Sequence, residues 1–194
     1  MADRAFIFDL DGTLWRSHEW YATVLGEVGG VEAADVLDRL AAGENLFRLA
    51  EAAGVSSARL VTACRRRTDS LVLYDGVREA LEGLAQAGCR LGIVTSLARR
   101  IAEPALADLR LEAYFEATEF AARKPSPTPL LAALRRLGCE GNQRHYYVGD
   151  MPNDARCAAG AGISFAWASY GYGPRPVEEV EVLTEFADVV KLCG

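Results

Sequence analysis

Two aspartates stand two positions apart near the start of the chain, in the segment DLDGTL at residues 9–14. Side chains alternate along an extended backbone, so Asp9 and Asp11 are expected to point to a common side, and Gly12 allows a sharp turn directly after them. Two carboxylates held this close repel each other unless a cation or a proton lies between them. A hard divalent cation with oxygen ligands answers that repulsion, and Mg²⁺ suits a site that also holds phosphate.

Further polar residues occur at the ends of other predicted strands and in the loops beside them. Thr95 and Ser96 carry hydroxyls that could donate hydrogen bonds to a phosphoryl oxygen, and Lys124 offers a point charge directly before a proline. Asp150 and Asp154 add two more carboxylates. Because ligands collect at the carboxyl ends of parallel strands, these residues predict a site that binds a ligand there.

Short apolar runs supply the strands that would position these residues. They lie at residues 5–8, 90–95, 145–148 and 164–168, with a weaker candidate at 187–190. Helical spacing of apolar residues predicts helices at 77–87 and after Ser126. Strands that alternate with helices are typical of an α/β fold, in which helices flank both faces of a parallel sheet. We expect Asp75 to cap the first of these helices and Pro104 to interrupt a later one.

The long segment between the first and second predicted strands does not follow this alternation. No strand is convincing there, and helical periodicity occurs at residues 33–40, 44–53 and 57–71. This helical segment is too long to be one crossover helix, so it indicates an inserted α-helical domain. We therefore predict a core domain at residues 1–15 and 76–194 and a helical cap domain at residues 16–75.

Composition limits the partners. The net charge of −6 and the pI near 5.1 argue against a protein built to bind nucleic acid or an anionic membrane. No apolar run is long enough for a membrane span, and the first residues do not resemble a signal peptide, so a cytoplasmic location is expected. The five cysteines form no CxxC pair, which indicates neither a zinc site nor a disulfide framework.

Four motifs in this order resemble those of the haloacid dehalogenase-like (HAD) hydrolase superfamily. They are DLDGTL at 9–14, Thr95 at the end of IVT, KPSP at 124–127 and GDMPND at 149–154. The resemblance covers essentially the whole core and implies a Rossmann-like sheet. The helical insertion is similar to the cap of the phosphoglycolate phosphatase-like branch, and the motif GYG at 171–173, in the core, also resembles that branch.

The resemblance implies a role for each matching residue. Asp9 would attack phosphorus and become an aspartyl phosphate, with Asp11 as general acid and then general base. Thr95 and Lys124 would hold the phosphoryl oxygens.

Magnesium is the cofactor that the resemblance implies. Asp9, the backbone carbonyl of Asp11 and Asp150 would bind the ion, and Asp154 would support the metal or its waters.

Some assignments have simpler alternatives. Ser96 could contact phosphate or only shape a turn, and Asp154 could serve only the start of a helix. Arg48, between two cap helices, could meet an anionic leaving group such as a carboxylate or could be an ordinary solvated arginine. His18 could face the substrate, although a surface imidazole is the favoured interpretation.

The sequence leaves three functions open. The favoured function is a magnesium-dependent phosphatase for small-molecule phosphate monoesters, with a phosphoglycolate-like substrate among the candidates, acting as a monomer or homodimer. The alternatives are a sugar phosphomutase that uses the same aspartyl phosphate and a catalytically silent binding protein with the same fold.

Overall fold

The computed structural model describes residues 4–139 and 144–194. Within that part of the chain, six strands form one sheet in the order β3-β2-β1-β4-β5-β6, and every neighbouring pair is parallel. The strands are β1 (Ala5–Phe8), β2 (Arg90–Val94), β3 (Ala117–Glu119), β4 (Tyr146–Gly149), β5 (Ser164–Ala168) and β6 (Glu181–Leu183). Because β1 lies between β2 and β4, the carboxyl ends of these three strands meet at one edge of the sheet.

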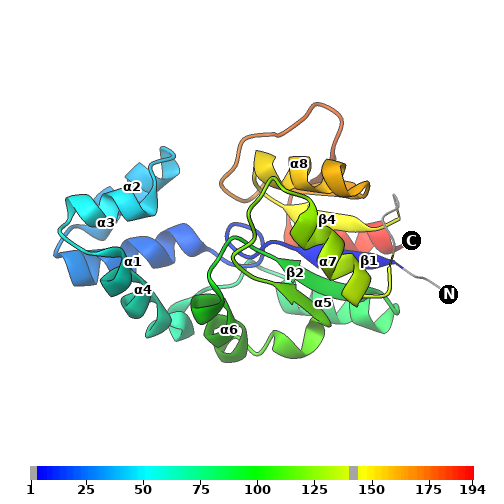
Figure 1. The fold of residues 1–194 in the computed structure, drawn as a ribbon, viewed down its shortest axis with the longest axis horizontal. Helices are drawn as coiled ribbons and strands as arrows, with labels where there is room; N and C mark the ends of the chain where they lie inside the picture. The colour runs from blue at the N-terminus through cyan, green and yellow to red at the C-terminus, as the bar shows by residue number, and fades with distance from the viewer. Residues whose placement is uncertain (1–3, 140–143) are drawn as a thin grey trace.

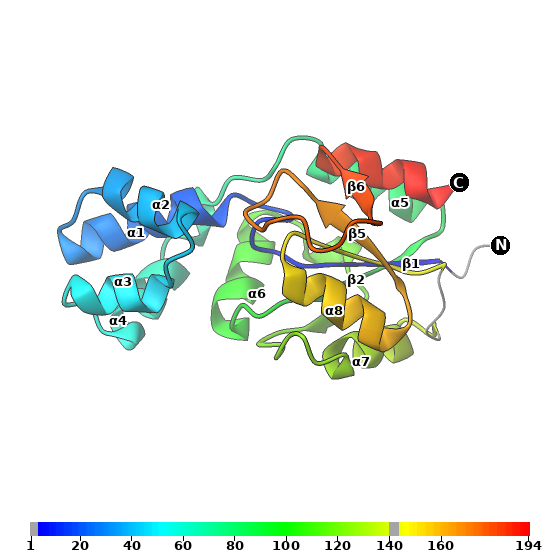
Figure 2. The same ribbon diagram turned by 90° about the horizontal axis from the view of Figure 1, so that it is seen from above.

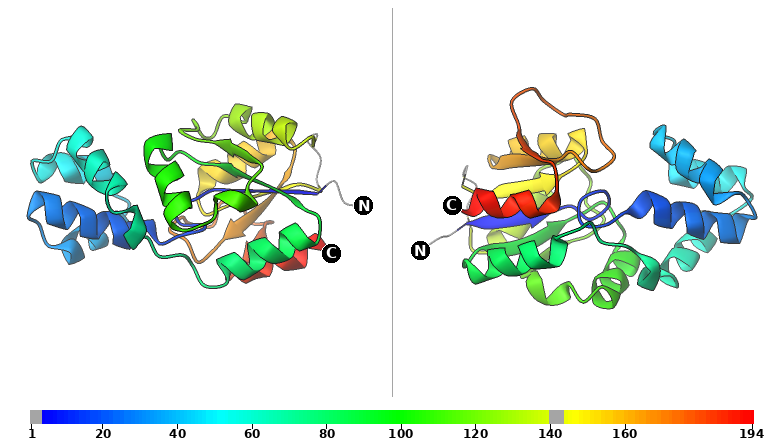
Figure 3. Two further views of the ribbon diagram at one scale, coloured as in Figure 1. Left: turned by 90° about the horizontal axis from the view of Figure 1, so that it is seen from below. Right: turned by 180° about the vertical axis from the view of Figure 1, so that it is seen from behind.

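Helices cover both faces of this sheet (Figures 1 and 2). α7 (Thr128–Arg136) and α8 (Pro152–Ala161) lie on one face. α5 (Val77–Gln86) and the 3-10 helix η3 (Phe186–Cys193) lie on the other, and Figure 3 shows the two layers with the sheet between them. The predicted α/β fold with a Rossmann-like parallel sheet is confirmed.

The central strand β1 consists of an unbroken apolar run because helices cover it on both sides. All four residues of β1 are fully buried. Ala5 and Ile7 pack in the cluster under α7 and α8, whereas Phe6 and Phe8 pack in the cluster under α5 and η3. Phe8 also meets Phe186 of η3 at a ring-centroid distance of 5.6 Å. A strand covered on both faces has no polar side, so its sequence cannot alternate.

Further helices lie beyond the carboxyl ends of the strands, to one side of the sheet (Figures 1 and 2). They are α1 (Ser17–Gly29), α2 (Ala33–Ala41), α3 (Leu46–Ala52), α4 (Ser57–Arg65) and the 3-10 helix η1 (Thr68–Ser70). α6 (Arg99–Asp108), which follows β2, contacts α4 and η1. We propose that residues 16–75 form a cap domain and that residues 1–15 and 76–194 form the core domain.

The two chain segments that join these helices to the sheet are paired with each other. The backbone N–H of Arg16 donates to the carbonyl of Val72 at 2.9 Å. The backbone N–H of Tyr74 donates to the carbonyl of Leu14 at 3.0 Å. Trp15 lies between these bonds, in an antiparallel bridge to the returning segment, and its side chain is fully buried. The entry and the exit of the helical group therefore run side by side.

Most strand predictions are confirmed. The strands expected at residues 5–8 and 164–168 match β1 and β5 at both ends, and those at 90–95 and 145–148 match β2 and β4 to within one residue. The helix expected at 77–87 is α5.

The weak strand prediction at residues 187–190 is wrong, because this segment lies in η3. Phe186 and Val189 are buried there, and their spacing of three residues is that of a 3-10 helix rather than of a strand. The edge strands β3 and β6 were not expected, because three residues each carry too little pattern to be recognised.

Two predictions about helix limits are also wrong. Gly76, in the left-handed conformation, occupies the cap position of α5, so Asp75 does not cap that helix. α6 runs through Pro104 without interruption. The buried residues Ile101 and Ala105 on either side of the proline pack into the core, and this packing holds the helix together despite the missing N–H.

Two expectations from composition concern cysteines and membranes. None of the five cysteines, all of which lie in the described part of the chain, forms a disulfide. Among residues 4–139 and 144–194, no helix is long and apolar enough to cross a membrane.

Candidate active site

The site begins where β1 ends. The backbone N–H of Asp9 donates to the carbonyl of Val148 at 2.9 Å, which continues the β1–β4 ladder by one residue and fixes Asp9 at the sheet edge. Asp9 is only 5% exposed. The chain then turns at Gly12, whose positive φ of 71° and close approach to the Asp150 side chain leave no room for a Cβ atom. The turn brings the loop after β1 against the loop after β4.

Lys124 connects two of the acidic side chains. Its ammonium group lies 2.6 Å from Oδ2 of Asp9 and 2.6 Å from Oδ1 of Asp154, and its side chain is 6% exposed. Burial alone would lower the pKa of Lys124, but Asp9 and Asp154 more than offset this effect and hold the pKa above its usual value. Lys124 is therefore a fixed positive charge across the physiological pH range.

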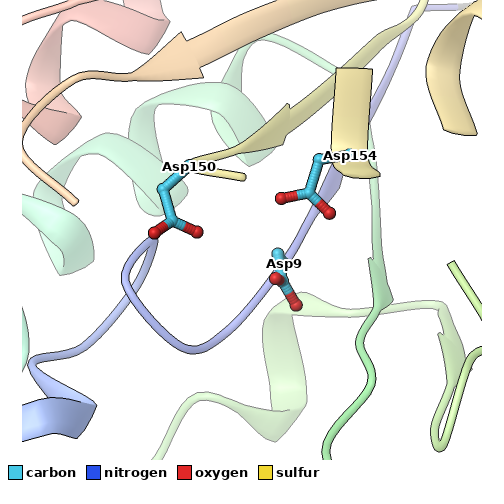
Figure 4. Close-up of side chains that lie close together, drawn as sticks. All are labelled: Asp9, Asp150 and Asp154. Carbon is cyan, nitrogen blue, oxygen red and sulfur yellow. The ribbon is translucent and has the colours of Figure 1, made fainter. Parts of the chain in front are cut away.

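Three carboxylates converge beside this lysine. One oxygen each from Asp9, Asp150 and Asp154 lies within 4.8 Å of the others, and all three residues are buried (Figure 4). Oδ1 of Asp9 and Oδ1 of Asp150 have no hydrogen-bond partner. Burial, followed by the charge of Asp9, raises the pKa of Asp150 to about 7.

This arrangement fits a divalent cation. Three buried carboxyl groups share one lysine, so the cluster has fewer positive than potentially negative side chains. Two of their oxygens lack partners, which is costly for buried acceptors unless a ligand binds them. Carboxylate oxygens are also the ligand type that hard cations such as Mg²⁺ prefer.

Asp154 serves two purposes at once. Its Oδ1 binds Lys124, while its Oδ2 accepts a 3.0 Å hydrogen bond from the backbone N–H of Met151 at the start of α8. Asp154 therefore does contact the start of α8, as the simpler alternative expects, and it also belongs to the cluster with Asp9 and Lys124.

Asp11 faces different partners from the three clustered carboxylates. Trp15 Nε1 donates to its Oδ1 at 2.7 Å, and the Tyr21 hydroxyl donates to its Oδ2 at 3.0 Å. Burial is the main cause that raises the pKa of Asp11 to about 6, and the Trp15 hydrogen bond opposes it. A carboxyl group in this environment can carry a proton close to neutral pH.

Thr95 and Ser96 follow β2 at the same edge. Thr95 is 1% exposed, and its Oγ1 accepts a 3.2 Å hydrogen bond from the backbone N–H of Leu97, which leaves its own O–H to donate. The Ser96 hydroxyl donates to the carbonyl of Ala122 at 3.1 Å, so its turn-forming alternative describes its present contact.

A cavity of about 420 Å³ joins these groups to the neighbouring helices. On the sheet side it is lined by Asp9, Asp11, Thr95, Ser96, Lys124 and Asp150. On the other side it is lined by the start of α1 and by the α2–α3 connection, including Glu44 and Asn45. The structure thus brings together all the predicted site residues except Arg48, and Asp154 joins them through Asp9, Asp150 and Lys124 without lining the cavity itself.

Comparison with known proteins gives the family. Residues 4–162 match the haloacid dehalogenase-like hydrolases. The chain belongs to this family. It is 32% identical to the phosphoglycolate phosphatase of Pectobacterium atrosepticum, over 100% of this chain and 93% of that protein. It is 35% identical to the phosphoglycolate phosphatase of Xanthomonas campestris, over 87% of this chain and 84% of that protein.

A solved structure supports the same assignment. The fold superposes with a TM-score of 0.79 on a protein from Lactobacillus plantarum that is described as a candidate phosphoglycolate phosphatase. That protein is 26% identical, and the match covers 99% of this chain and 100% of that one. The predictions of the HAD-like family and of a phosphoric monoester hydrolase within it are confirmed.

Arg48 lies apart from the cavity of this HAD-like hydrolase. The residue is exposed and lines a separate shallow hollow with Glu51 and Ser56. A contact between Arg48 and the leaving group stays a prediction, and it would require the α2–α3 region to move.

Several aromatic residues of the site were not found from the sequence. Trp15 and Tyr21 hold Asp11, and the Tyr147 hydroxyl lies 3.3 Å from both Lys124 Nζ and Asp154 Oδ1. None of these residues belongs to the motif patterns, and aromatic residues beside apolar runs usually indicate core.

The sequence did contain a signal for one further site residue, Tyr172. It is the middle residue of GYG at 171–173, and its backbone N–H donates to Oδ2 of Asp150 at 2.9 Å. Cβ atoms at Gly171 and Gly173 would both collide with Asp150. The two glycines let this segment close over Asp150, which explains why the short motif accompanies the acidic ones.

The position of His18 also differs from the surface position that the sequence favoured. The residue lines the cavity, is half-buried rather than on the surface, and stacks on Tyr172 with ring centroids 3.5 Å apart and planes 5° apart.

Proposed function

We propose that this HAD-like hydrolase is a magnesium-dependent phosphatase that hydrolyses small-molecule phosphate monoesters through an aspartyl phosphate on Asp9. The observation that carries the proposal is the position of Asp9. One of its oxygens is held by Lys124 at 2.6 Å and the other is buried without a partner, beside two more carboxylates. An aspartate in this setting is a fixed nucleophile, and one of its oxygens has no hydrogen-bond partner in the protein.

Asp9, Asp150 and Asp154 would hold the metal ion, and the ion supplies positive charge that offsets the negative charge of the phosphoryl group. Lys124 adds a second positive charge next to the nucleophile, and the Thr95 hydroxyl is free to donate to a phosphoryl oxygen. Positioning and charge neutralisation of this kind account for most of the catalysis in phosphoryl transfer.

Asp11 would complete the chemistry. In the first step an Asp9 oxygen forms a bond to phosphorus, the ester P–O bond breaks, and protonated Asp11 gives its proton to the leaving oxygen. In the second step Asp11, now ionised, takes a proton from water, which attacks phosphorus, releases phosphate and restores Asp9. A pKa of about 6 suits a group that gives and takes a proton near neutral pH.

The leaving group is less defined than the phosphoryl site. The names of the curated relatives suggest 2-phosphoglycolate, which agrees with the substrate considered from the sequence. The alignment with the Pectobacterium protein spans 225 positions, more than the 194 residues of this chain, so that relative contains segments that this chain lacks. Its substrate contacts therefore need not carry over. The cytoplasmic location and the monomeric or dimeric state stay predictions.

A panel of phosphate esters assayed with and without Mg²⁺ tests the proposal. The panel contains an aryl phosphate, 2-phosphoglycolate, polyol phosphates and hexose phosphates. We expect phosphate release that EDTA abolishes and that Asp9→Asn lowers by at least about 1000-fold. Near-normal turnover by a folded Asp9→Asn protein would contradict the mechanism.

The same panel separates the alternatives. Isomerised sugar phosphate without free phosphate would indicate the phosphomutase. Binding of esters without any turnover would indicate the silent binding protein.

A further inference from the structure

The wall of the cavity at the start of α1 includes two residues that each have a buried polar atom without a hydrogen-bond partner. Ser17 is 1% exposed, and its Oγ has no hydrogen-bond partner. His18 is half-buried as a residue, but its Nδ1 atom is buried and also has no hydrogen-bond partner. Both residues line the cavity, at the point where α1 begins. Buried polar atoms are normally paired, so two adjacent unpaired ones beside an open cavity indicate a ligand that pairs them.

The imidazole of His18 is held in place by its surroundings. It lies parallel to the ring of Tyr172 at 3.5 Å. The Tyr172 hydroxyl accepts a 3.0 Å hydrogen bond from the backbone N–H of His18 and donates to Glu19 at 3.1 Å. The backbone N–H of Tyr172 in turn donates to Asp150. The orientation of His18 is thereby fixed relative to the proposed metal site, which is what a specificity-determining residue requires.

The charges around the cavity argue against a carboxylate in the leaving group. Among the described residues that line it, Lys124 is the sole lysine or arginine, and it already binds Asp9 and Asp154. The nearby Arg39 binds both oxygens of Glu44 at 2.9 Å and is likewise engaged. A carboxylate that enters this space would lose its hydration without gaining a cation.

His18 does not supply the missing positive charge. Burial lowers its pKa below the usual value, and the nearby Glu19 only partly opposes that effect. A neutral imidazole has one nitrogen that donates and one that accepts, and a serine hydroxyl does both. Such a pair is complementary to hydroxyl groups, which also donate and accept.

We propose that Ser17 and His18 bind hydroxyl groups of the leaving group, and that the enzyme therefore prefers phosphate monoesters of neutral polyols to those of hydroxy acids. This inference rests on the proposed phosphatase function and narrows its substrate class. It differs from the substrate that the relatives' names suggest.

The first test compares three substrates on the wild-type enzyme with Mg²⁺ present. Glycerol 3-phosphate represents the polyol esters, 2-phosphoglycolate the hydroxy acid esters, and p-nitrophenyl phosphate the phosphoryl chemistry alone. We expect kcat/KM for glycerol 3-phosphate to exceed that for 2-phosphoglycolate by about tenfold or more, the effect of one hydrogen bond gained and one uncompensated charge avoided. Equal or higher kcat/KM for 2-phosphoglycolate would overturn the inference.

The second test uses Ser17→Ala and His18→Phe. The phenylalanine keeps an aromatic ring that can stack on Tyr172 and removes both nitrogens, although its six-membered ring is larger than the imidazole. Each variant should raise KM for glycerol 3-phosphate by about tenfold with kcat changed less than about twofold, because the lost contact acts on binding. Their kcat/KM for p-nitrophenyl phosphate, whose leaving group has no additional hydroxyl, should fall by much less than their kcat/KM for glycerol 3-phosphate. Thr23→Ala, which removes an exposed hydroxyl from the same helix, is the matched control and should change neither constant.

The outcomes separate this inference from the proposed function. An enzyme that hydrolyses none of the three esters overturns both. Hydrolysis of p-nitrophenyl phosphate, with no rise in KM for glycerol 3-phosphate in either variant, overturns the polyol site and leaves the phosphatase mechanism standing. An equal loss on all three substrates would show a structural role for Ser17 and His18, and it would also overturn the inference.

Discussion

The hydroxyl of Tyr21, on α1, donates a 3.0 Å hydrogen bond to Oδ2 of Asp11 in the loop after β1. This contact joins the helical region to the proposed general acid. Trp15 Nε1 binds the other oxygen of the same carboxylate, so both oxygens are held. The direction in which Asp11 delivers its proton therefore depends on a residue that belongs to the proposed cap.

Tyr21→Phe removes this contact and keeps the ring. We expect kcat for p-nitrophenyl phosphate to fall by about tenfold with little change in KM, because a misplaced acid slows chemistry more than binding. Steady-state kinetics measures the split. Tyr114→Phe, on a tyrosine outside the cavity, is the control. If Tyr21→Phe raised KM and left kcat unchanged, Tyr21 would be a binding residue rather than a positioning one.

Lys124→Met tests the ion pairs of the buried lysine. Its removal leaves Asp9 and Asp154 as uncompensated buried charges. Breaking a buried pair in this way costs about 3–5 kcal/mol in the free energy of unfolding. Urea denaturation in EDTA measures that loss, and added Mg²⁺ should recover part of it.

Activity gives a second readout of the same variant. We expect Lys124→Met to lower kcat/KM by at least about 1000-fold even where it folds fully. Lys124→Arg keeps the charge but not the compact shape and should restore stability better than activity. Full activity in Lys124→Met would remove the lysine from the mechanism.

The pKa of Asp150 predicts how stability depends on pH. Burial raises that pKa to about 7 in the folded protein, against about 4 in an unfolded chain. The folded state therefore binds more protons between these values, so the free energy of unfolding of the metal-free protein falls as pH rises from about 4 to about 7. Asp11, with a pKa of about 6, acts in the same direction.

Magnesium should reverse this trend, because it replaces the protons. We expect Mg²⁺ to raise Tm by about 4 °C or more at a pH near 7.5 and by much less at a pH near 5. Thermal unfolding with Mg²⁺ and with EDTA measures both. Asp150→Asn should lose the Mg²⁺ shift together with the part of the pH slope that Asp150 causes, while the part caused by Asp11 remains. A Mg²⁺ shift of equal size at both pH values would contradict the assignment of Asp150 as a ligand.

Gly171→Ala tests the closure of the GYG segment over Asp150. The added methyl group would collide with the Asp150 side chain and with the carbonyl of Gly12. We expect weaker activation by Mg²⁺, because Asp150, the proposed metal ligand, must shift to make room. The Mg²⁺ concentration that gives half-maximal activity should rise about tenfold or more. Gly83→Ala, in the interior of α5 where a methyl group meets only Val190 at 3.9 Å, is the control and should be neutral or slightly stabilising.

Arg48→Ala separates the sequence-based prediction from the position that the structure gives. Arg48 lies outside the cavity, so we expect unchanged kcat/KM, within about twofold, for every ester in the panel. A selective loss for 2-phosphoglycolate would instead restore the predicted contact with a carboxylate and would require the α2–α3 region to close over the site.

The residues of the candidate site could be predicted because they follow strands whose burial dictates their sequence. β1 must be apolar on both faces, so the polar residues directly after it stand out. Thr95 and Asp150 follow β2 and β4 in the same way, and the apolar runs of those strands predict that both residues lie at one edge of the sheet. Their places in the chain carry this information because neighbouring parallel strands share that edge.

The supporting residues could not be predicted in the same way. Tyr21 and Tyr172 reach the site from α1 and from the segment after β5, and each makes a contact that depends on the packing of two distant elements. Aromatic residues are normally read as core, and nothing in their local pattern reveals a hydroxyl or backbone N–H that faces a carboxylate. The strands β3 and β6 were not predicted for a related reason. Edge strands of three residues are recognised by their pairing with neighbouring strands, which the sequence does not show.

The paired linkers around Trp15 have a consequence for engineering. Because the segments at Arg16 and Val72 are hydrogen-bonded to each other, the chain leaves the sheet and returns to it at almost one point. A helical insert from a relative, cut at the same pair, would arrive with its two ends already aligned. Chimeras joined there would exchange the helical wall of the cavity, including Tyr21 and its contact with Asp11, while the sheet and its four aspartates keep their sequence.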